Sequence, residues 1–121
     1  MNMSDYTPAF KRLSEIYSLL GQPARLQIVA LIGKGEVCVC HIKSTLGFRQ
    51  AYISQQLMGL RKAGWVTTRR KGRKIYYSLT DARMLDLLEF TAKIFNLNID
   101  LPQIPEVDGC AYYSNPITPK Q

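Results

Sequence analysis

The chain has 121 residues and a formal net charge of +7, with a hydrophobic fraction of 46% that suits one domain with a small core. No apolar run approaches the roughly 18 residues of a membrane span, and residues 1–8 are polar without a signal-peptide core, so we expect a cytoplasmic protein with no membrane contact. Residues 1–96 carry 15 Lys or Arg against 6 Asp or Glu, whereas residues 97–121 carry one Lys against three acids. The positive charge therefore belongs to the body of the chain.

Two helices are predicted before residue 35. The first runs from about Pro8 to Leu20, with apolar residues at positions 13, 16, 17 and 20 that form one helical stripe. The second runs from Pro23 to about Ile32, and the glycines at positions 33 and 35 end it.

A helix-turn-helix is predicted over residues 36–63. Its first helix extends from Glu36 to Gly47, and its second runs from about Arg49 to Ala63. Apolar residues at positions 53, 57 and 60 give the second helix one buried stripe. Polar side chains that lie off this stripe can pair with base edges. They are Gln50, Ser54, Gln55 and Gln56.

A basic β-hairpin is predicted after this helix, from Trp65 to Leu79. Between Val37 and Thr80 the chain has nine Lys or Arg and no Asp or Glu. This charge on a helix-turn-helix and a hairpin indicates a nucleic-acid-binding protein. The hairpin cations are expected along phosphates or the minor groove, and they are Arg69, Arg70, Lys71, Arg73 and Lys74. The alternatives are a solvated charged face and a winged helix used only for protein contacts.

A last helix is predicted from Asp81 to about Asn96. Apolar residues cover most of its circumference, so it should be buried on more than one side. We expect it to form a homodimer surface with the first helix, and complete burial within one subunit is the alternative. Four prolines after Leu97 argue against regular structure there. The expected organisation is a DNA-binding and dimerisation domain over residues 1–96 and an irregular tail over 97–121.

The predicted fold class is mainly α with a small β-hairpin, a winged helix-turn-helix with an added helix at each end. Five segments carry a resemblance: LGQPARLQI (20–28), GEVCVCHI (35–42), GFRQAYISQQL (47–57), LRKAGWV (60–66) and RKGRKIYY (70–77). Over about residues 10–95 the chain resembles the ArsR/SmtB family of metal-responsive bacterial repressors. The resemblance implies a homodimer that binds operator DNA and releases it when an inducer binds. It places Gln50, Ser54 and Gln55 at the bases, with Tyr52 and Gln56 as further candidates.

Three cysteines are the candidate inducer site: Cys38, Cys40 and Cys110. The Cys-Val-Cys motif matches the family's signature for sensing soft metals, and three thiolates suit As(III), Sb(III), Cd(II) or Pb(II). Lys43 stands where some arsenic sensors of the family have a third Cys, so the resemblance to cadmium and lead sensors makes the tail cysteine the expected third ligand. The last helix has no His, which excludes the zinc site that other members carry there. No permanent cofactor is expected.

The spacing of the first two cysteines limits how they can share an ion. In a regular helix Cys38 and Cys40 would point about 200° apart, so either the pair lies before the helix or ion binding distorts the helix start. Two small core residues are the plain alternative. A disulfide from either one to Cys110 would instead make the chain a redox or sulfide-type sensor. An enzyme is not expected, because the chain has one His and no recognisable nucleophile–base pair.

Overall fold

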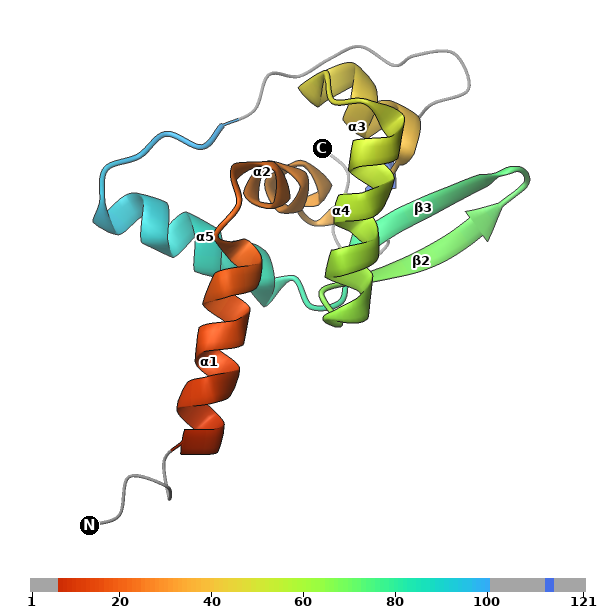
Figure 1. The fold of residues 1–121 in the computed structure, drawn as a ribbon. Coiled ribbons are helices and arrows are strands. Elements are labelled where there is room, and N and C mark those ends of the chain that lie inside the picture. Colours follow the sequence, from red (N-terminus) through yellow and green to blue (C-terminus); the bar gives the residue numbers. More distant parts are fainter. Residues whose placement is uncertain (1–6, 101–112, 115–121) are drawn as a thin grey trace.

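Five helices account for most of residues 7–100 and 113–114, which the computed structural model describes (Figure 1). The helices are α1 (Thr7–Leu20), α2 (Pro23–Ile32), α3 (Val39–Leu46), α4 (Gln50–Lys62) and α5 (Arg83–Ile94). The strands are β1 (Gly35–Cys38), β2 (Val66–Lys71), β3 (Lys74–Leu79) and β4 (Tyr113–Ser114). They form one antiparallel sheet in the order β2-β3-β1-β4. This confirms the predicted winged helix-turn-helix with an added helix at each end.

The ends of the helices follow from local sequence. Pro23 occupies the first turn of α2, where its missing N–H costs nothing. After α4, Gly64 adopts the left-handed conformation at φ 80°. There the N–H of Trp65 donates to Leu60 O (2.9 Å) and the N–H of Gly64 to Arg61 O (3.0 Å), which together form a Schellman motif. This motif directs the chain from α4 into the hairpin.

The core lies around α2, which contacts every other helix. The predicted stripe of α4 is confirmed, since Ile53, Leu57 and Leu60 are almost completely buried. The largest fully buried side chains are Ile28, Val29, Ile32, Val37, Ile42, Ile53, Leu57 and Leu60. Burying each such side chain contributes about 1.5–3 kcal/mol before entropy is counted, so this cluster fixes the angle at which α4 is presented.

The prediction that residues 36–38 begin a helix is wrong, because they form β1. Val37 pairs with Tyr77 and Cys38 with Tyr76 of β3, so a ladder with a distant strand holds this segment extended. Cys38 is then the extended residue that precedes α3, at φ −93° and ψ 167°. The sequence next to residues 36–38 gives no sign of this pairing, so these residues were assigned to the first turn of the following helix.

The prediction that the tail has no regular structure is also wrong at two residues. Tyr113 and Ser114 form β4, which pairs with Glu36 and Gly35 of β1. The four prolines of the tail lie at positions outside this pair, so they do not prevent it. Residues 113–114 therefore lie beside the strand that ends at Cys38.

Large apolar side chains remain exposed on α1 and α5. Phe10 is 64% exposed, Tyr17 61%, Phe90 65% and Ile94 57%. Complete burial of the last helix within one subunit is thus excluded for the described chain, and in Figure 1 the N-terminal half of α1 projects from the body. Among the described residues, no helix has the length and apolarity needed to cross a membrane.

Candidate nucleic-acid interface and thiol pair

The outer face of α4 gathers most of the predicted base-reading residues. Gln50, Ser54 and Gln55 are exposed, and Tyr52 lies beside them with 41% of its surface exposed. The ring of Phe48 packs edge to face on Tyr52, with centroids 5.4 Å apart, and limits where that ring can point. The side chains of Phe48, Tyr52, Ser54 and Gln55 line one shallow hollow that begins at the turn before α4. Amide and hydroxyl groups on a protruding helix can form hydrogen bonds with base edges in a major groove.

The prediction that Gln56 contributes to this surface is wrong. Its side chain is 6% exposed, and its Oε1 accepts a hydrogen bond of 2.8 Å from Nε of Arg25 on α2. The helical period explains the error, because position 56 lies three residues after Ile53 and four before Leu60, on the inward side of α4. Gln56 therefore supports the helix from inside and does not face solvent.

The hairpin has cationic side chains on both sides of its turn. Gly72 lies in this turn and adopts the left-handed conformation at φ 62°. Arg70, Lys71 and Arg73 are exposed, and Lys74 is half-buried. These side chains extend the basic surface of α4 along β2 and β3, which Figure 1 shows reaching away from the body. Their position suits the phosphate contacts that were predicted for them.

Arg69 departs from the predicted group of phosphate-binding cations. Its Nη2 lies 2.5 Å from Oε1 of Glu36 on β1, and its Nε lies 3.2 Å from both carboxylate oxygens. The guanidinium also lies over the ring of Tyr76, 5.5 Å from its centroid. The ion pair with Glu36 neutralises the charge of Arg69 within the protein. It also joins β2 to β1 across the intervening β3, and we call this pair the clamp. Glu36 was missed from the sequence, although it is the last acid before the acid-free stretch.

Cys38 and Cys40 lie together at the junction of β1 and α3. Their sulfurs are 2.6 Å apart, and Cys38 is 3% exposed. Cys38 precedes α3 in an extended conformation and Cys40 lies in the first turn of α3, so the two sulfurs meet across the start of the helix. Two sulfurs in this position can ligate one soft ion without a distortion of the helix start. The two sulfurs are therefore already close together without the distortion of the helix start that was the other alternative.

The surroundings of the two sulfurs connect them to the hairpin. Nζ of Lys74 on β3 donates to Sγ of Cys40 at 3.3 Å. Tyr76, 4% exposed, packs with both cysteines in a small cluster separate from the main core. His41 follows in α3, and partial burial lowers its pKa below the ordinary value of 6.5, which favours a neutral ring.

A third ligand is not placed by the described residues. Within residues 7–100 and 113–114, no three His, Cys, Asp or Glu side chains come together as a metal site. Cys110, the predicted third thiolate, lies outside the described residues. Of the two cysteines described, Cys38 is free and Cys40 is disulfide-bonded. Both sulfurs are soft ligands once reduced, and they are unsuited to Mg²⁺ or Ca²⁺.

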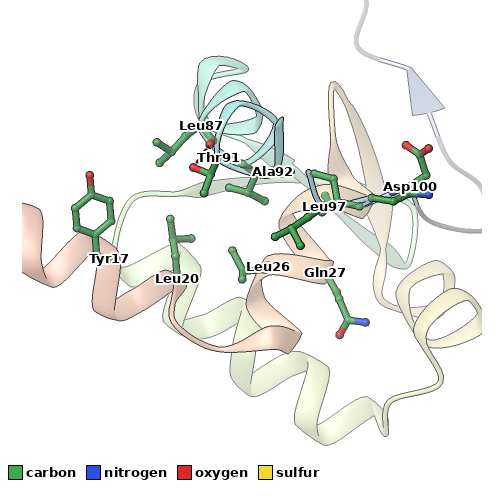
Figure 2. A pocket seen from close by; sticks show the side chains of 13 residues that line it. Tyr17, Leu20, Leu26, Gln27, Leu87, Thr91, Ala92, Leu97 and Asp100 are labelled. Carbon is green, nitrogen blue, oxygen red and sulfur yellow. Dashed lines mark hydrogen bonds between the residues drawn. The ribbon is translucent and has the colours of Figure 1, made fainter. Parts of the chain in front are cut away.

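A hollow of about 460 Å³ lies between α1, α2, α5 and the segment after α5 (Figure 2). Leu20, Leu26, Leu87 and Ala92 give it apolar walls, and Leu97 closes one side. Other large apolar side chains of α1 and α5 are exposed, so this side of the subunit is an extended apolar face. A soluble monomer rarely exposes so much contiguous apolar surface.

Comparison with known families and sequences gives consistent results. The family model described as bacterial regulatory protein, arsR family, matches residues 22–68. A biofilm growth-associated repressor of Agrobacterium fabrum is 39% identical over 70% of this chain and 75% of its own length. An arsenical resistance operon repressor of Staphylococcus aureus is 34% identical over 75% of this chain and 82% of its own. A transcriptional repressor SmtB homolog of Synechocystis sp. is 34% identical over 64% of this chain, and the match spans only 58% of that repressor.

Solved structures with the same architecture include two winged-helix regulators. The transcriptional repressor BigR from Xylella fastidiosa superposes with a TM-score of 0.67 at 33% identity, covering 78% of this chain and 97% of the other. The homodimeric winged helix-turn-helix DNA-binding domain of Mb0332 from Mycobacterium bovis gives a TM-score of 0.64 at 29% identity, covering 77% and 90%.

Proposed function

The chain belongs to the arsR family of bacterial regulatory proteins, and on that premise we propose that it is a homodimeric, DNA-binding transcriptional repressor released by a thiophilic ion. The ligands are the thiolates of Cys38, Cys40 and Cys110, and the inducer is As(III), Sb(III), Cd(II) or Pb(II). The observation that carries the proposal is the pair of sulfurs 2.6 Å apart at the junction of the sheet and the helix-turn-helix.

DNA binding is supported by the exposed polar face of α4 and the adjoining cations of the hairpin. Two copies of α4 in a symmetric dimer would enter successive major grooves about 34 Å apart. Gln50, Ser54 and Gln55 then contact bases, and Arg70, Lys71 and Arg73 contact phosphates.

Dimerisation is supported by the apolar face of α1 and α5, which a second copy would cover. Phe90 and Ile94 of α5 are more than half exposed in the single subunit. The similar domain of Mb0332 is described as homodimeric. Burial of these side chains against a second copy would supply about 25 cal/mol per Å² of apolar surface removed from water.

Participation of Cys110 in the thiol site is supported by the attachment of the tail. Tyr113 pairs with Glu36, which precedes Cys38 by two residues. Cys110 precedes Tyr113 by three residues, and three residues span at most about 10 Å of chain. This short spacing along the chain supports Cys110 as the third ligand of the proposed site.

Release of DNA by the ion is supported by the contact of Cys40 with the hairpin. An ion bound at Cys40 occupies the sulfur to which Lys74 now donates, so the half-buried Lys74 must find another partner. Because Lys74 begins β3, its rearrangement alters how the hairpin is presented to phosphates. Allosteric couplings of this kind are typically about 1–3 kcal/mol, or about 5- to 150-fold in affinity.

The test compares wild type with Cys38→Ser, Cys40→Ser and Cys110→Ser under strong reductant. The DNA is a duplex that wild type has selected from a random-sequence pool. All four proteins should bind it, wild type should release it on adding As(III) or Cd(II), and the first two variants should not. Release that persists in both of these variants would remove the thiol pair from the switch. The Cys110→Ser variant reports whether two thiolates suffice.

A second candidate, a thiol redox sensor on the same scaffold, is favoured by the state of the two cysteines, since Cys40 is disulfide-bonded and Cys38 is free. Reduction of the disulfide would give a Cys40 thiolate beside the cationic Lys74, a setting that suits reaction with oxidants. Release of DNA by a mild oxidant, reversal by dithiothreitol and no response to ions under reductant would support this candidate over ion binding.

A further inference from the structure

The guanidinium of Arg25 joins three helices, and its described bonds involve neither the cysteines nor the exposed residues of α4. Arg25 lies in the first turn of α2. Its Nη1 donates to the backbone oxygen of Leu19 at 3.1 Å, and its Nε donates to Oε1 of Gln56 at 2.8 Å. The first acceptor is one of the last carbonyl groups of α1, which the helix itself leaves without a partner. The second lies in the middle of α4.

The sequence leaves space in α4 for this guanidinium. Gly59 is one turn after Gln56, and a Cβ added there would lie 3.2 Å from Nη2 and 3.6 Å from Cζ of Arg25. A glycine inside a helix is destabilising relative to alanine. The recognition helix therefore carries a residue that weakens it locally at the position where the guanidinium sits.

The contact is directional, unlike the apolar packing around it. Gln56 is 6% exposed, so its amide depends on the protein for a partner. A hydrogen bond weakens steeply with misalignment, so the bond to Arg25 opposes rotation of α4 about its axis. Such a rotation would carry Ser54 and Gln55, next to Gln56 in the chain, sideways across the base edges.

We infer that Arg25 and Gln56 are positioning residues for sequence-specific recognition of DNA. They hold α4 at a fixed rotation relative to the C-terminal end of α1. Because α1 lies on the proposed dimer face, its position then sets the orientation of α4 in the major groove. The inference rests on the proposed function as a DNA-binding dimer, and it assigns no DNA contact to either residue.

The experiment measures two affinities for each variant. One duplex is selected by wild type from a random-sequence pool, and the other is a scrambled duplex of equal length and composition. Gln56→Leu removes the hydrogen-bond acceptor without changing the charge. Arg25→Lys keeps the charge but replaces the guanidinium, whose Nε and Nη1 donate to two helices. Gln56→Glu keeps a hydrogen-bond acceptor. Gly59→Leu fills the space that the Arg25 guanidinium occupies and raises the helix propensity of α4. Arg12→Lys is the matched control, because Arg12 makes only an exposed pair with Glu15 among the contacts described for it.

Three variants, Gln56→Leu, Arg25→Lys and Gly59→Leu, should lower the ratio of selected to scrambled affinity about tenfold. Their affinity for the scrambled duplex should stay within about twofold of wild type, and the salt slope should be unchanged, because no phosphate contact is lost. Gln56→Glu should restore the ratio, and Arg12→Lys should leave it at the wild-type value. A merely structural role would lower both affinities together in proportion to the unfolded fraction.

A wild-type ratio in a folded, dimeric Gln56→Leu protein overturns the inference, as does an equal loss on both duplexes. If Gln56→Leu does not fold, the ratios of Arg25→Lys and Gly59→Leu decide in the same way. Failure of the proposed function gives a different result, in which wild type binds neither duplex in a salt-dependent way.

Discussion

Loss of the ion pair between Glu36 and Arg69 should lower the stability of the fold and raise its affinity for DNA. The substitution Glu36→Gln keeps the shape of the side chain and removes its charge. The carboxylate is only 15% exposed, whereas the Arg69 side chain is 50% exposed. The pair is thus neither a surface ion pair, for which about 0.2–1 kcal/mol is usual, nor fully buried. With two oxygens engaged, a loss of about 1–2 kcal/mol in the free energy of unfolding is expected.

The same substitution frees a cation on the hairpin. Once Arg69 is released from Glu36, it can neutralise a phosphate, so affinity for a random duplex should rise. Each added phosphate contact steepens the slope of log affinity against log salt by about 0.9. Urea unfolding measures the first effect, and fluorescence anisotropy with a labelled random duplex at several salt concentrations measures the second.

Two controls separate the clamp from a general gain in charge. Arg69→Gln breaks the same pair and should lower stability similarly, but without steepening the salt slope. Glu15→Gln makes the same change of charge on α1, where Glu15 pairs with Arg12 on an exposed surface, and it should alter neither quantity appreciably. If Glu36→Gln keeps both wild-type stability and the wild-type slope, the clamp does not restrain the hairpin and the reasoning fails.

Three further predictions concern the dimer, the DNA contacts and acid stability. Phe90→Glu should split the dimer without unfolding the subunit, because this ring is 65% exposed in one subunit; light scattering and circular dichroism check both parts. Gln55→Ala should cost about 1–3 kcal/mol on the selected duplex and little on a scrambled one, whereas Lys71→Ala should weaken both and flatten the salt slope by about one unit. Hydrogen bonds from the Arg83 side chain and backbone lower the pKa of Asp81 from 3.8 to about 2. The ionised carboxylate therefore stabilises the fold above pH 3.8, and this stabilisation is lost as the pH falls to about 2. Asp81→Asn should therefore flatten the stability profile in that window, as thermal unfolding against pH will show.

The helices of the fold could be predicted from sequence because their signals are local. Apolar spacing located α2 and α4, and Pro23 and Gly64 marked a start and an end. Strand β1 could not be predicted in this way, because three residues of β3, some 40 positions later, hold it extended. Strand β4 was missed for the same reason, since its partner lies far back in the chain.

The site was predictable in composition but not in geometry. The exposure of the polar residues on the outer face of α4 could be predicted from the helical period, whereas Gln56 was misplaced because a polar residue near a buried stripe was assumed to face solvent. Its partner, Arg25, lies 31 residues away and no local pattern connects the two. The proximity of the two sulfurs was likewise hidden, because it depends on Cys38 ending a strand and not beginning a helix.

The alternation of β1 separates the thiol pair from the main core. Val37 faces the main core, and Cys38 faces the opposite side of the sheet, where Tyr76 packs against it. Arg69 pairs with Tyr76 in the register and lies on that same side. Under the proposed function, a change at the sulfurs would reach the hairpin across this face of the sheet, whereas the bond between Arg25 and Gln56 joins α2 to α4. Because the two sets share no described contact, their effects on DNA affinity should add as free energies, so that Arg25→Lys changes specificity and leaves the inducer response intact.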